Sequence, residues 1–337
     1  MRVRNGLGLA LLATTALGLA ACGGAGDEGA DGEEIALFTK NQTNPYFQSI
    51  RVGADAAARQ MGARIVHYVP TRADSIPEQM SQIEDVIVKR PDAIVFIPVD
   101  HNAMVPGVEK MTAAGIPVVN LTDRSASGRF VSFVGCDDRR LGRDAGRYLL
   151  DRLNGRGGVI ILEGVGGSNN SALRVSGFRD AIDELPDVRL LASQPGNFQR
   201  LQALQVTENL LQAHAQVDGI LAANDSMALG AIEALQAADR TALVVGINGT
   251  KEAVDAIKTG ALLASSDCNG FVQGCIGAMA AIRHLRGMSV PAEFQFTQPV
   301  VDAANYAAWD APDEQRSCPV WESVMATDAA AVSASGP

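Results

Sequence analysis

The sequence predicts an α/β fold that consists of two doubly wound parallel-sheet domains. Short apolar or β-branched runs alternate with amphipathic stretches along most of the chain, which is typical of repeated βαβ units. The strand runs are almost continuously apolar, as in parallel strands that are buried on both faces. The chain has 337 residues and more predicted strands than one open sheet comfortably holds, so we expect two sheets.

The predicted elements form two series. The first series has strands at 35–38, 64–68, 93–98 and 117–120, and helices at 45–61, 76–90 and 103–114. The second series has strands at 158–162, 189–192, 219–222 and 242–247, and helices at 139–153, 172–185, 201–213, 227–237 and 251–259. Right-handed crossovers between consecutive parallel strands would fold each series into one doubly wound sheet.

The composition excludes several classes of function. The 28 Lys and Arg stand against 38 Asp and Glu, which gives a net charge of −10 and argues against a nucleic-acid binder. The five Cys and four His contain no CxxC or HExxH pattern, so we predict no metal site. The glycine-rich run 164–168 is followed by Asn169, where a dinucleotide-binding fingerprint needs a glycine, and the chain has no P-loop lysine or GxSxG elbow. We therefore predict neither an enzyme nor a cofactor.

The first residues have the pattern of an export signal. Arg2 and Arg4 precede an uncharged run over 6–21, which is too short for a membrane span. The run ends in Leu19-Ala20-Ala21-Cys22, which resembles the lipobox of bacterial lipoproteins. We predict a lipoprotein signal peptide at 1–21, lipidation of Cys22 and a flexible tether at 22–33. The alternative is an ordinary secretory peptide with an incidental cysteine. Either interpretation implies export, and the first adds a lipid anchor to a membrane, in the periplasm or at the cell surface.

Polar residues follow the predicted strands at corresponding positions. They lie at 39–47, 121–124, 163–168, 223–226 and 248–250. In open parallel sheets a ligand binds beyond the carboxyl ends of the strands, so we expect these residues to meet at one cleft between the two domains.

Three motifs carry a family resemblance. They are Asn44-Pro45-Tyr46-Phe47, the run 192–195 followed by Phe198, and the run 224–230. Together they resemble the type I sugar-binding periplasmic proteins of ABC transporters, of the ribose, galactose and arabinose type, over about residues 34–302. The resemblance implies two Rossmann-like domains joined by three hinge crossovers. The expected lobes are 34–136 plus 269–297 and 137–268 plus 298–325, with a frayed tail at 326–337.

The resemblance also implies a set of ligand-binding residues. It assigns them from both lobes: Lys40, Asn44, Tyr46, Phe47, Asp123, Arg124, Arg174, Phe198, Asn224, Asn248 and Cys268. Of the two adjacent aromatic residues, only one is expected to face the cleft. Asp225 fits the cap of the following helix better than Asn224, which leaves Asn224 for the ligand. Lys40, Asn248 and Cys268 depart from the ribose-type pattern, and the first two resemble the arabinose-binding branch.

These residue types suit a sugar. A hydroxyl group both donates and accepts a hydrogen bond, and the set combines acceptors, donors and amides that do both. The resemblance therefore implies a monomer that captures a monosaccharide or polyol by hinge closure and delivers it to a membrane permease. Two alternatives stay open, namely an acidic sugar or another small polar molecule as the ligand, and presentation of the ligand to a chemoreceptor or a histidine kinase.

With Cys22 assigned to lipid, four cysteines remain, which allow three disulfide pairings. Cys136 and Cys268 lie at two expected domain crossovers, so a disulfide between them is geometrically possible when these crossovers are neighbours. Cys275 and Cys318 would then form the second pair.

Overall fold

The computed structural model describes residues 32–296 and 299–325. The predicted signal peptide at 1–21, the lipidation site Cys22, most of the tether and the tail at 326–337 lie outside the described residues. Within the described part, no helix is both long and apolar enough to span a bilayer.

The first lobe contains a six-stranded sheet with the order β11-β5-β4-β3-β1-β2, in which every pair is parallel. Its strands are β1 (Glu34–Phe38), β2 (Arg64–Tyr68), β3 (Ala93–Phe96), β4 (Val118–Leu121), β5 (Ser132–Gly135) and β11 (Glu293–Gln295). Its helices are α1 (Pro45–Met61), α2 (Ile76–Lys89), α3 (Val105–Ala113) and α9 (Gly270–Leu285).

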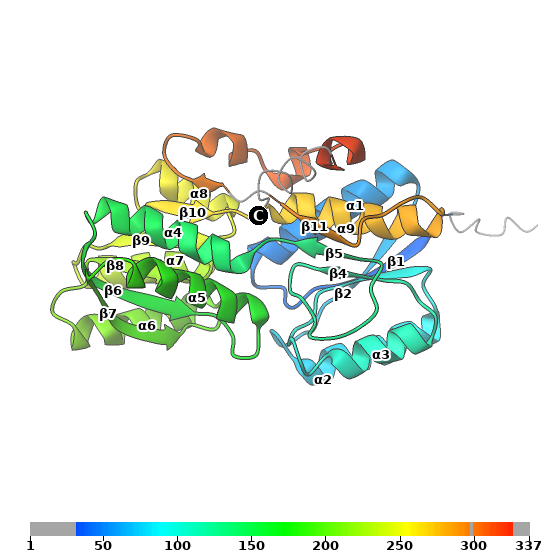
Figure 1. Ribbon diagram of the computed structural model, residues 1–337, viewed down its shortest axis with the longest axis horizontal. Coiled ribbons are helices and arrows are strands. Elements are labelled where there is room, and N and C mark those ends of the chain that lie inside the picture. The colour runs from blue at the N-terminus through cyan, green and yellow to red at the C-terminus, as the bar shows by residue number, and fades with distance from the viewer. Residues whose placement is uncertain (1–31, 297–298, 326–337) are drawn as a thin grey trace, which may run out of the picture. The chain divides into compact units, whose positions relative to one another are not determined.

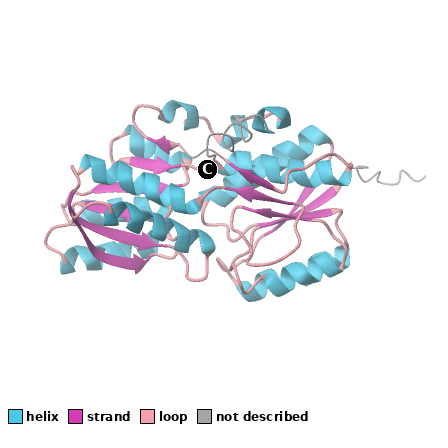
Figure 2. Cartoon of the chain, in the orientation of Figure 1, coloured by secondary structure: helices cyan, strands magenta, loops and turns pink. Residues whose placement is uncertain are grey.

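Alternating residues of β1 bury the two faces of this sheet. Ile35 and Leu37 belong to a core cluster with residues of α1 and α9, whereas Ala36 and Phe38 belong to a separate cluster with residues of α2 and α3. Successive side chains of a strand point to opposite faces, so a continuously apolar strand is covered on both sides by helices. Figure 2 shows these layers of helices and strands.

The second lobe has a sheet with the order β12-β10-β9-β8-β6-β7. Its strands are β6 (Arg156–Glu163), β7 (Asp187–Pro195), β8 (Gly219–Ala222), β9 (Leu243–Ile247), β10 (Ala264–Ser266) and β12 (Val300–Val301). Its helices are α4 (Asp138–Arg152), α5 (Asn169–Asp183), α6 (Arg200–Ala213), α7 (Asp225–Ala237) and α8 (Lys251–Lys258). All pairs are parallel except β10 with β12. The prediction of two doubly wound parallel sheets is therefore confirmed.

Three crossovers connect the lobes. They run from β5 to α4, from β10 to α9 and from β11 to β12. The first two lie side by side, because a disulfide joins Cys136 to Cys268 with 6.1 Å between their Cα atoms. A second disulfide joins Cys275 of α9 to Cys318, with 5.6 Å between the Cα atoms.

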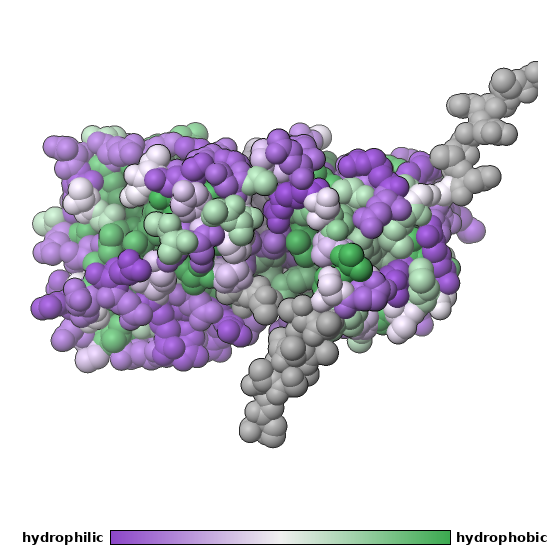
Figure 3. All heavy atoms as spheres, turned by 90° about the horizontal axis from the view of Figure 1, so that it is seen from above, coloured by the Kyte–Doolittle hydropathy of each residue, from purple (hydrophilic) through white to green (hydrophobic). Residues whose placement is uncertain are grey.

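The segment 299–325 differs from the expectation that 298–325 belongs to the second lobe. It starts there as β12, but Trp321 is buried in the core of the first lobe, with its ring centroid 5.1 Å from that of Phe294. The end of the chain thus crosses back to the first lobe. Figure 1 shows this segment in orange and red along the top of the view, and Figure 3 shows a largely hydrophilic surface from that side.

Candidate functional site

A partly open cavity lies where the carboxyl ends of the two sheets meet. Its lining comes from both lobes and consists of Lys40, Asn44, Tyr46, Phe47, Asp74, Thr122, Asn170, Arg174, Phe198, Asn224 and Asn248. Eight of these eleven residues belong to the set that the sequence predicted.

A buried ion pair lies beside the cavity in the first lobe. The Lys40 ammonium group contacts Oδ2 of Asp123, and the two side chains are only 5% and 0% exposed. Ser168 of the second lobe donates a hydrogen bond of 3.0 Å to the same carboxylate oxygen. Oδ1 of Asp123 is buried and has no hydrogen-bond partner among the described residues. Since a buried acceptor without a partner is costly, this oxygen is suited to a hydroxyl group of a ligand.

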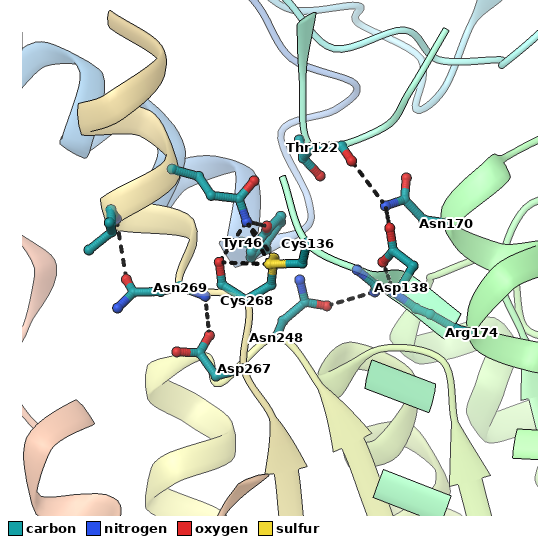
Figure 4. Close-up of a disulfide and its surroundings, with 12 residues drawn as sticks. Tyr46, Thr122, Cys136, Asp138, Asn170, Arg174, Asn248, Asp267, Cys268 and Asn269 are labelled. Atoms are coloured by element: carbon teal, nitrogen blue, oxygen red, sulfur yellow. Dashed lines mark hydrogen bonds and ion pairs between the residues drawn. A yellow bond between two sulfur atoms is a disulfide. The ribbon is translucent and has the colours of Figure 1, made fainter. Parts of the chain in front are cut away.

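A second buried ion pair lies in the second lobe. Nε of Arg174 donates to Oδ1 of Asp138 over 2.8 Å, and Nη1 donates to the backbone oxygen of Ala223 and to Oδ1 of Asn248. Asn170 donates to the other oxygen of Asp138 over 2.7 Å. Burial raises the pKa of Asp138, while the charge of Arg174 opposes this increase. Figure 4 shows that these bonds fix the guanidinium group of Arg174 beside Asn248.

Three aromatic residues line the cavity, all of which the sequence predicted. Contrary to the expectation for the adjacent pair, both Tyr46 and Phe47 reach the lining, with their rings packed edge to face at 5.8 Å. The Tyr46 hydroxyl accepts a hydrogen bond of 2.6 Å from Gln273, and burial raises the pKa of Tyr46. Phe198 packs on Gly164, where an added Cβ would lie 2.1 Å from the Phe198 ring. Glycine is therefore required at 164 for the ring to take this position.

Asn44 and Asn224 each cap a helix and line the cavity as well. Oδ1 of Asn44 accepts from the backbone N–H of Tyr46 in α1. Oδ1 of Asn224 accepts from the N–H of Met227 in α7, while its amide nitrogen donates to the backbone oxygen of Phe198. The expectation that Asp225 caps this helix is wrong. Asp225 is buried and instead accepts from Thr250 and Ser265, which ties the end of β9 to β10.

Four lining residues other than glycine have a left-handed backbone. Their φ angles are 57° at Asp74, 52° at Thr122, 58° at Phe198 and 129° at Asn248. This conformation is unfavourable for a β-branched residue such as Thr122 and for a bulky one such as Phe198. Strained residues of this kind cluster at functional sites, where the surrounding structure holds them in place.

Three predicted residues do not line the cavity, namely Asp123, which lies beside it, Arg124 and Cys268. Arg124 is 43% exposed on its side chain, donates to Glu293 over 2.6 Å and lies 3.7 Å above the Phe133 ring. The left-handed turn at Thr122 places the Asp123 side chain inside and the Arg124 side chain outside. Cys268 is held in the disulfide with Cys136 and accepts from Gln273, and it does not line the cavity.

The predicted ligand set did not include Asp74, Thr122 and Asn170, although Thr122 lies in the polar run 121–124 that was expected at the cleft. Thr122 and Asn170 lie close to the carboxyl ends of β4 and β6, where residues of a ligand site are expected. Asp74 lies in the loop between β2 and α2, and its Oδ2 accepts from Asn41 over 3.3 Å. Burial and the charge of Asp123 raise its pKa, which Lys40 opposes. Because this loop follows the carboxyl end of β2, its position alone could have indicated that Asp74 lies at the ligand site.

Comparisons with known proteins agree with this fold and site. A family model described as a periplasmic binding protein domain matches residues 35–289. The ribose import binding protein of Haemophilus influenzae is 34% identical over 84% of this chain and 95% of its own length. The xylitol-binding protein of Mycolicibacterium smegmatis is 28% identical over 90% of this chain and 88% of its own.

A similar solved structure is an ABC transporter periplasmic solute binding protein of Actinobacillus succinogenes with bound D-allose. It has a TM-score of 0.78 and 33% identity, and the match covers 82% of this chain and 99% of that one. The family match spans well over half of the chain, and the resemblance inferred from the motifs is confirmed. The chain belongs to the periplasmic binding protein family.

Proposed function

We propose that this protein is the solute-binding subunit of an ABC importer and that it captures a neutral pentose, hexose or related polyol. Relatives that share about a third of its residues are named for ribose import and for binding of ribose and allose. They favour import over the alternative of presenting a ligand to a sensor.

The pairing of the buried charges carries the proposal that the ligand is neutral. Lys40 is paired with Asp123, and Arg174 is paired with Asp138. Asp74 adds a further carboxyl group to the lining. Both cations at the lining are already paired with carboxylates, so a carboxylate or phosphate on the ligand would find no unpaired cation there. Burying such an unpaired negative charge is costly. Hydroxyl groups need no such partner, so a neutral sugar fits this site better than an acidic one.

Three kinds of contact would hold the sugar. Oδ1 of Asp123 and the Asp74 carboxylate accept from its hydroxyl groups, and Arg174 donates to them. The rings of Phe47 and Phe198 cover its apolar C–H face. Because these groups come from both lobes, the ligand gains its full set of contacts only when the lobes are closed.

Direct contacts between the lobes show that they are closed in this structure. Besides the bond from Ser168 to Asp123, the N–H of His101 donates to the backbone oxygen of Gly167 over 3.1 Å, and Thr43 donates to Gln199 over 3.3 Å. We propose that the lobes rotate about the crossovers that connect them, which include 136–137 and 268–269, and that the permease recognises the closed monomer.

The family implies an exported, periplasmic protein. We propose in addition that lipid on Cys22 anchors the mature chain to a membrane and that 22–33 acts as its tether. Substitution of Cys22 by Ala would then release the protein from the membrane fraction. Retention of Cys22→Ala in that fraction, in the absence of the permease, would refute the anchor.

A ligand screen tests the proposed function. Thermal shifts with D-ribose, D-allose, xylitol, L-arabinose, D-galactose and D-glucuronate would identify a binder, and calorimetry would give its Kd. We expect at least one neutral compound to bind and glucuronate not to bind. Asp123→Ala should abolish binding, whereas its neighbour Arg124→Ala serves as a matched control outside the cavity and should retain it. Binding of none of the neutral compounds, or preferential binding of glucuronate, would contradict the proposal.

A further inference from the structure

The segment 299–325, which we call the strap, makes a fourth connection between the lobes. It begins as β12 in the sheet of the second lobe and reaches the core of the first lobe at Trp321. The family match ends at residue 289, so the strap lies outside the matched region. In Figure 1 the strap passes above α8 and α9, on the side of the molecule where the crossovers lie.

β12 and the packing of Tyr306 and Trp309 on the core hold the first part of the strap to the second lobe, and polar contacts follow. Nε1 of Trp309 donates to Oδ2 of Asp267 over 2.5 Å, at the start of the crossover that follows β10. Asp310 forms ion pairs of 2.9 Å with Lys258 and 3.3 Å with Lys251, both on α8. Asp310 and these lysines are about two-fifths exposed, and ion pairs at this exposure are weak and sensitive to salt.

The attachment to the first lobe includes a covalent bond. Asp313 accepts from Ser49 of α1, and Arg316 donates to Oδ1 of Asn269 over 2.8 Å. The disulfide between Cys318 and Cys275 of α9 then fixes the strap covalently. Trp321 follows in the apolar core of this lobe. A force on the strap would therefore break the polar contacts of Trp309 and Asp310 before it broke this covalent anchor.

The junction between the two attachments is short. Only Ala311 and Pro312 separate Asp310, on the second lobe, from Asp313, on the first lobe. Three consecutive backbone steps reach at most about 11 Å. When the lobes rotate apart, the two attachment points must stay within this reach, or else the contacts of Asp310 and Trp309 must break.

We propose that the strap restrains hinge opening and shifts the ligand-free protein toward the closed arrangement. Its contacts with both lobes coexist with the direct contacts between the lobes at the cavity, so they stabilise that arrangement. A larger closed fraction raises the apparent ligand affinity, because less of the binding energy is used for closure. The expected effect on affinity rests on the proposed function, whereas the effect on opening does not.

The test compares strap variants with a matched surface variant. Asp310→Asn removes the ion pairs with α8, and Cys275→Ser with Cys318→Ser removes the covalent anchor. Asp180→Asn breaks a comparable exposed ion pair, with Arg139, away from the strap. Small-angle scattering of each ligand-free protein reports the opening, and calorimetry with the sugar found in the screen reports Kd.

We expect both strap variants to have a larger radius of gyration without ligand than the native protein and Asp180→Asn. The Kd of Asp310→Asn should rise about twofold to tenfold, as expected for the loss of weak ion pairs, and the Kd of the disulfide variant should also rise. The chain contains two tryptophans, so Trp321→Phe leaves Trp309 as the remaining one, and its emission, excited selectively over that of tyrosine, should change when the lobes close. Native scattering from both strap variants overturns the restraint, even when their thermal stability falls. A native chain that binds no sugar refutes the proposed function alone, because scattering still measures the opening.

Discussion

The pairing of Arg174 with Asp138 gives the sharpest prediction. The two side chains are only 5% and 6% exposed, and substitution of Arg174 by Met leaves the Asp138 carboxylate buried with Asn170 as its remaining side-chain donor. Removal of one partner of a buried ion pair costs about 3–5 kcal/mol. We therefore expect Arg174→Met to lower the free energy of unfolding of the ligand-free protein by about that amount at neutral pH.

Urea unfolding measures this loss. The control Arg139→Met removes an exposed partner of Asp180 and should cost less than about 1 kcal/mol. Arg174→Met combined with Asp138→Asn should be more stable than Arg174→Met alone, because the uncompensated charge is gone. A loss below about 1 kcal/mol for Arg174→Met, or a double variant that loses the sum of the two single losses, would refute the reasoning.

The pH dependence of the same variant has a definite sign. Burial already raises the pKa of Asp138, and without Arg174 it rises further. A carboxyl group with a raised pKa in the folded state binds its proton more tightly there than in the unfolded chain, so its contribution to stability falls as pH increases through that window. The deficit of Arg174→Met relative to the native protein should therefore shrink as the pH is lowered.

The remaining predictions concern two acids and a disulfide. Burial raises the pKa of Asp267 from 3.8 to about 6, so its contribution to the free energy of unfolding should fall by about 3 kcal/mol between pH 4 and pH 6. Asp267→Asn should remove this pH dependence from thermal melts. An unchanged pH dependence in Asp267→Asn would refute the prediction. Asp74→Asn should weaken sugar binding about tenfold or more, and the native affinity should fall at acidic pH as this carboxylate is protonated; equal Kd values for both proteins would exclude Asp74 from the ligand contacts. Non-reducing peptide mapping should recover Cys136 linked to Cys268, and free thiols at both positions would disprove that pairing.

Most of the framework follows from local patterns in the sequence. The strands of the two sheets alternate with amphipathic helices, and the residues after β1, β4, β8 and β9 meet at the cavity because parallel strands share one carboxyl edge. The periodicity failed for α9, which the sequence analysis did not predict. Its residues from Gly270 to Ile282 are buried on nearly every side, so no polar face marks it as a helix.

The errors at the site have a different origin. Adjacent residues in a loop are directed by backbone angles that composition does not reveal, so Asp123 and Arg124 were assigned together although only Asp123 lies beside the cavity. The assignment of the α7 cap to Asp225 failed because tertiary partners, Thr250 and Ser265, compete for that carboxylate. The backbone thus decides the side-chain directions of Asp123 and Arg124, whereas long-range contacts decide that of Asp225.

The left-handed residues at the cavity connect the rigidity of the site to the mobility of the hinge. Thr122, Phe198 and Asn248 keep unfavourable backbone angles because packing and hydrogen bonds hold them in both lobes. Each half of the site is therefore preorganised, and little of the binding energy is used to order side chains within a lobe. The affinity for the ligand then depends mainly on the free energy of bringing the two halves of the site together. A strap that joins the lobes can change affinity through this quantity without contacting the ligand.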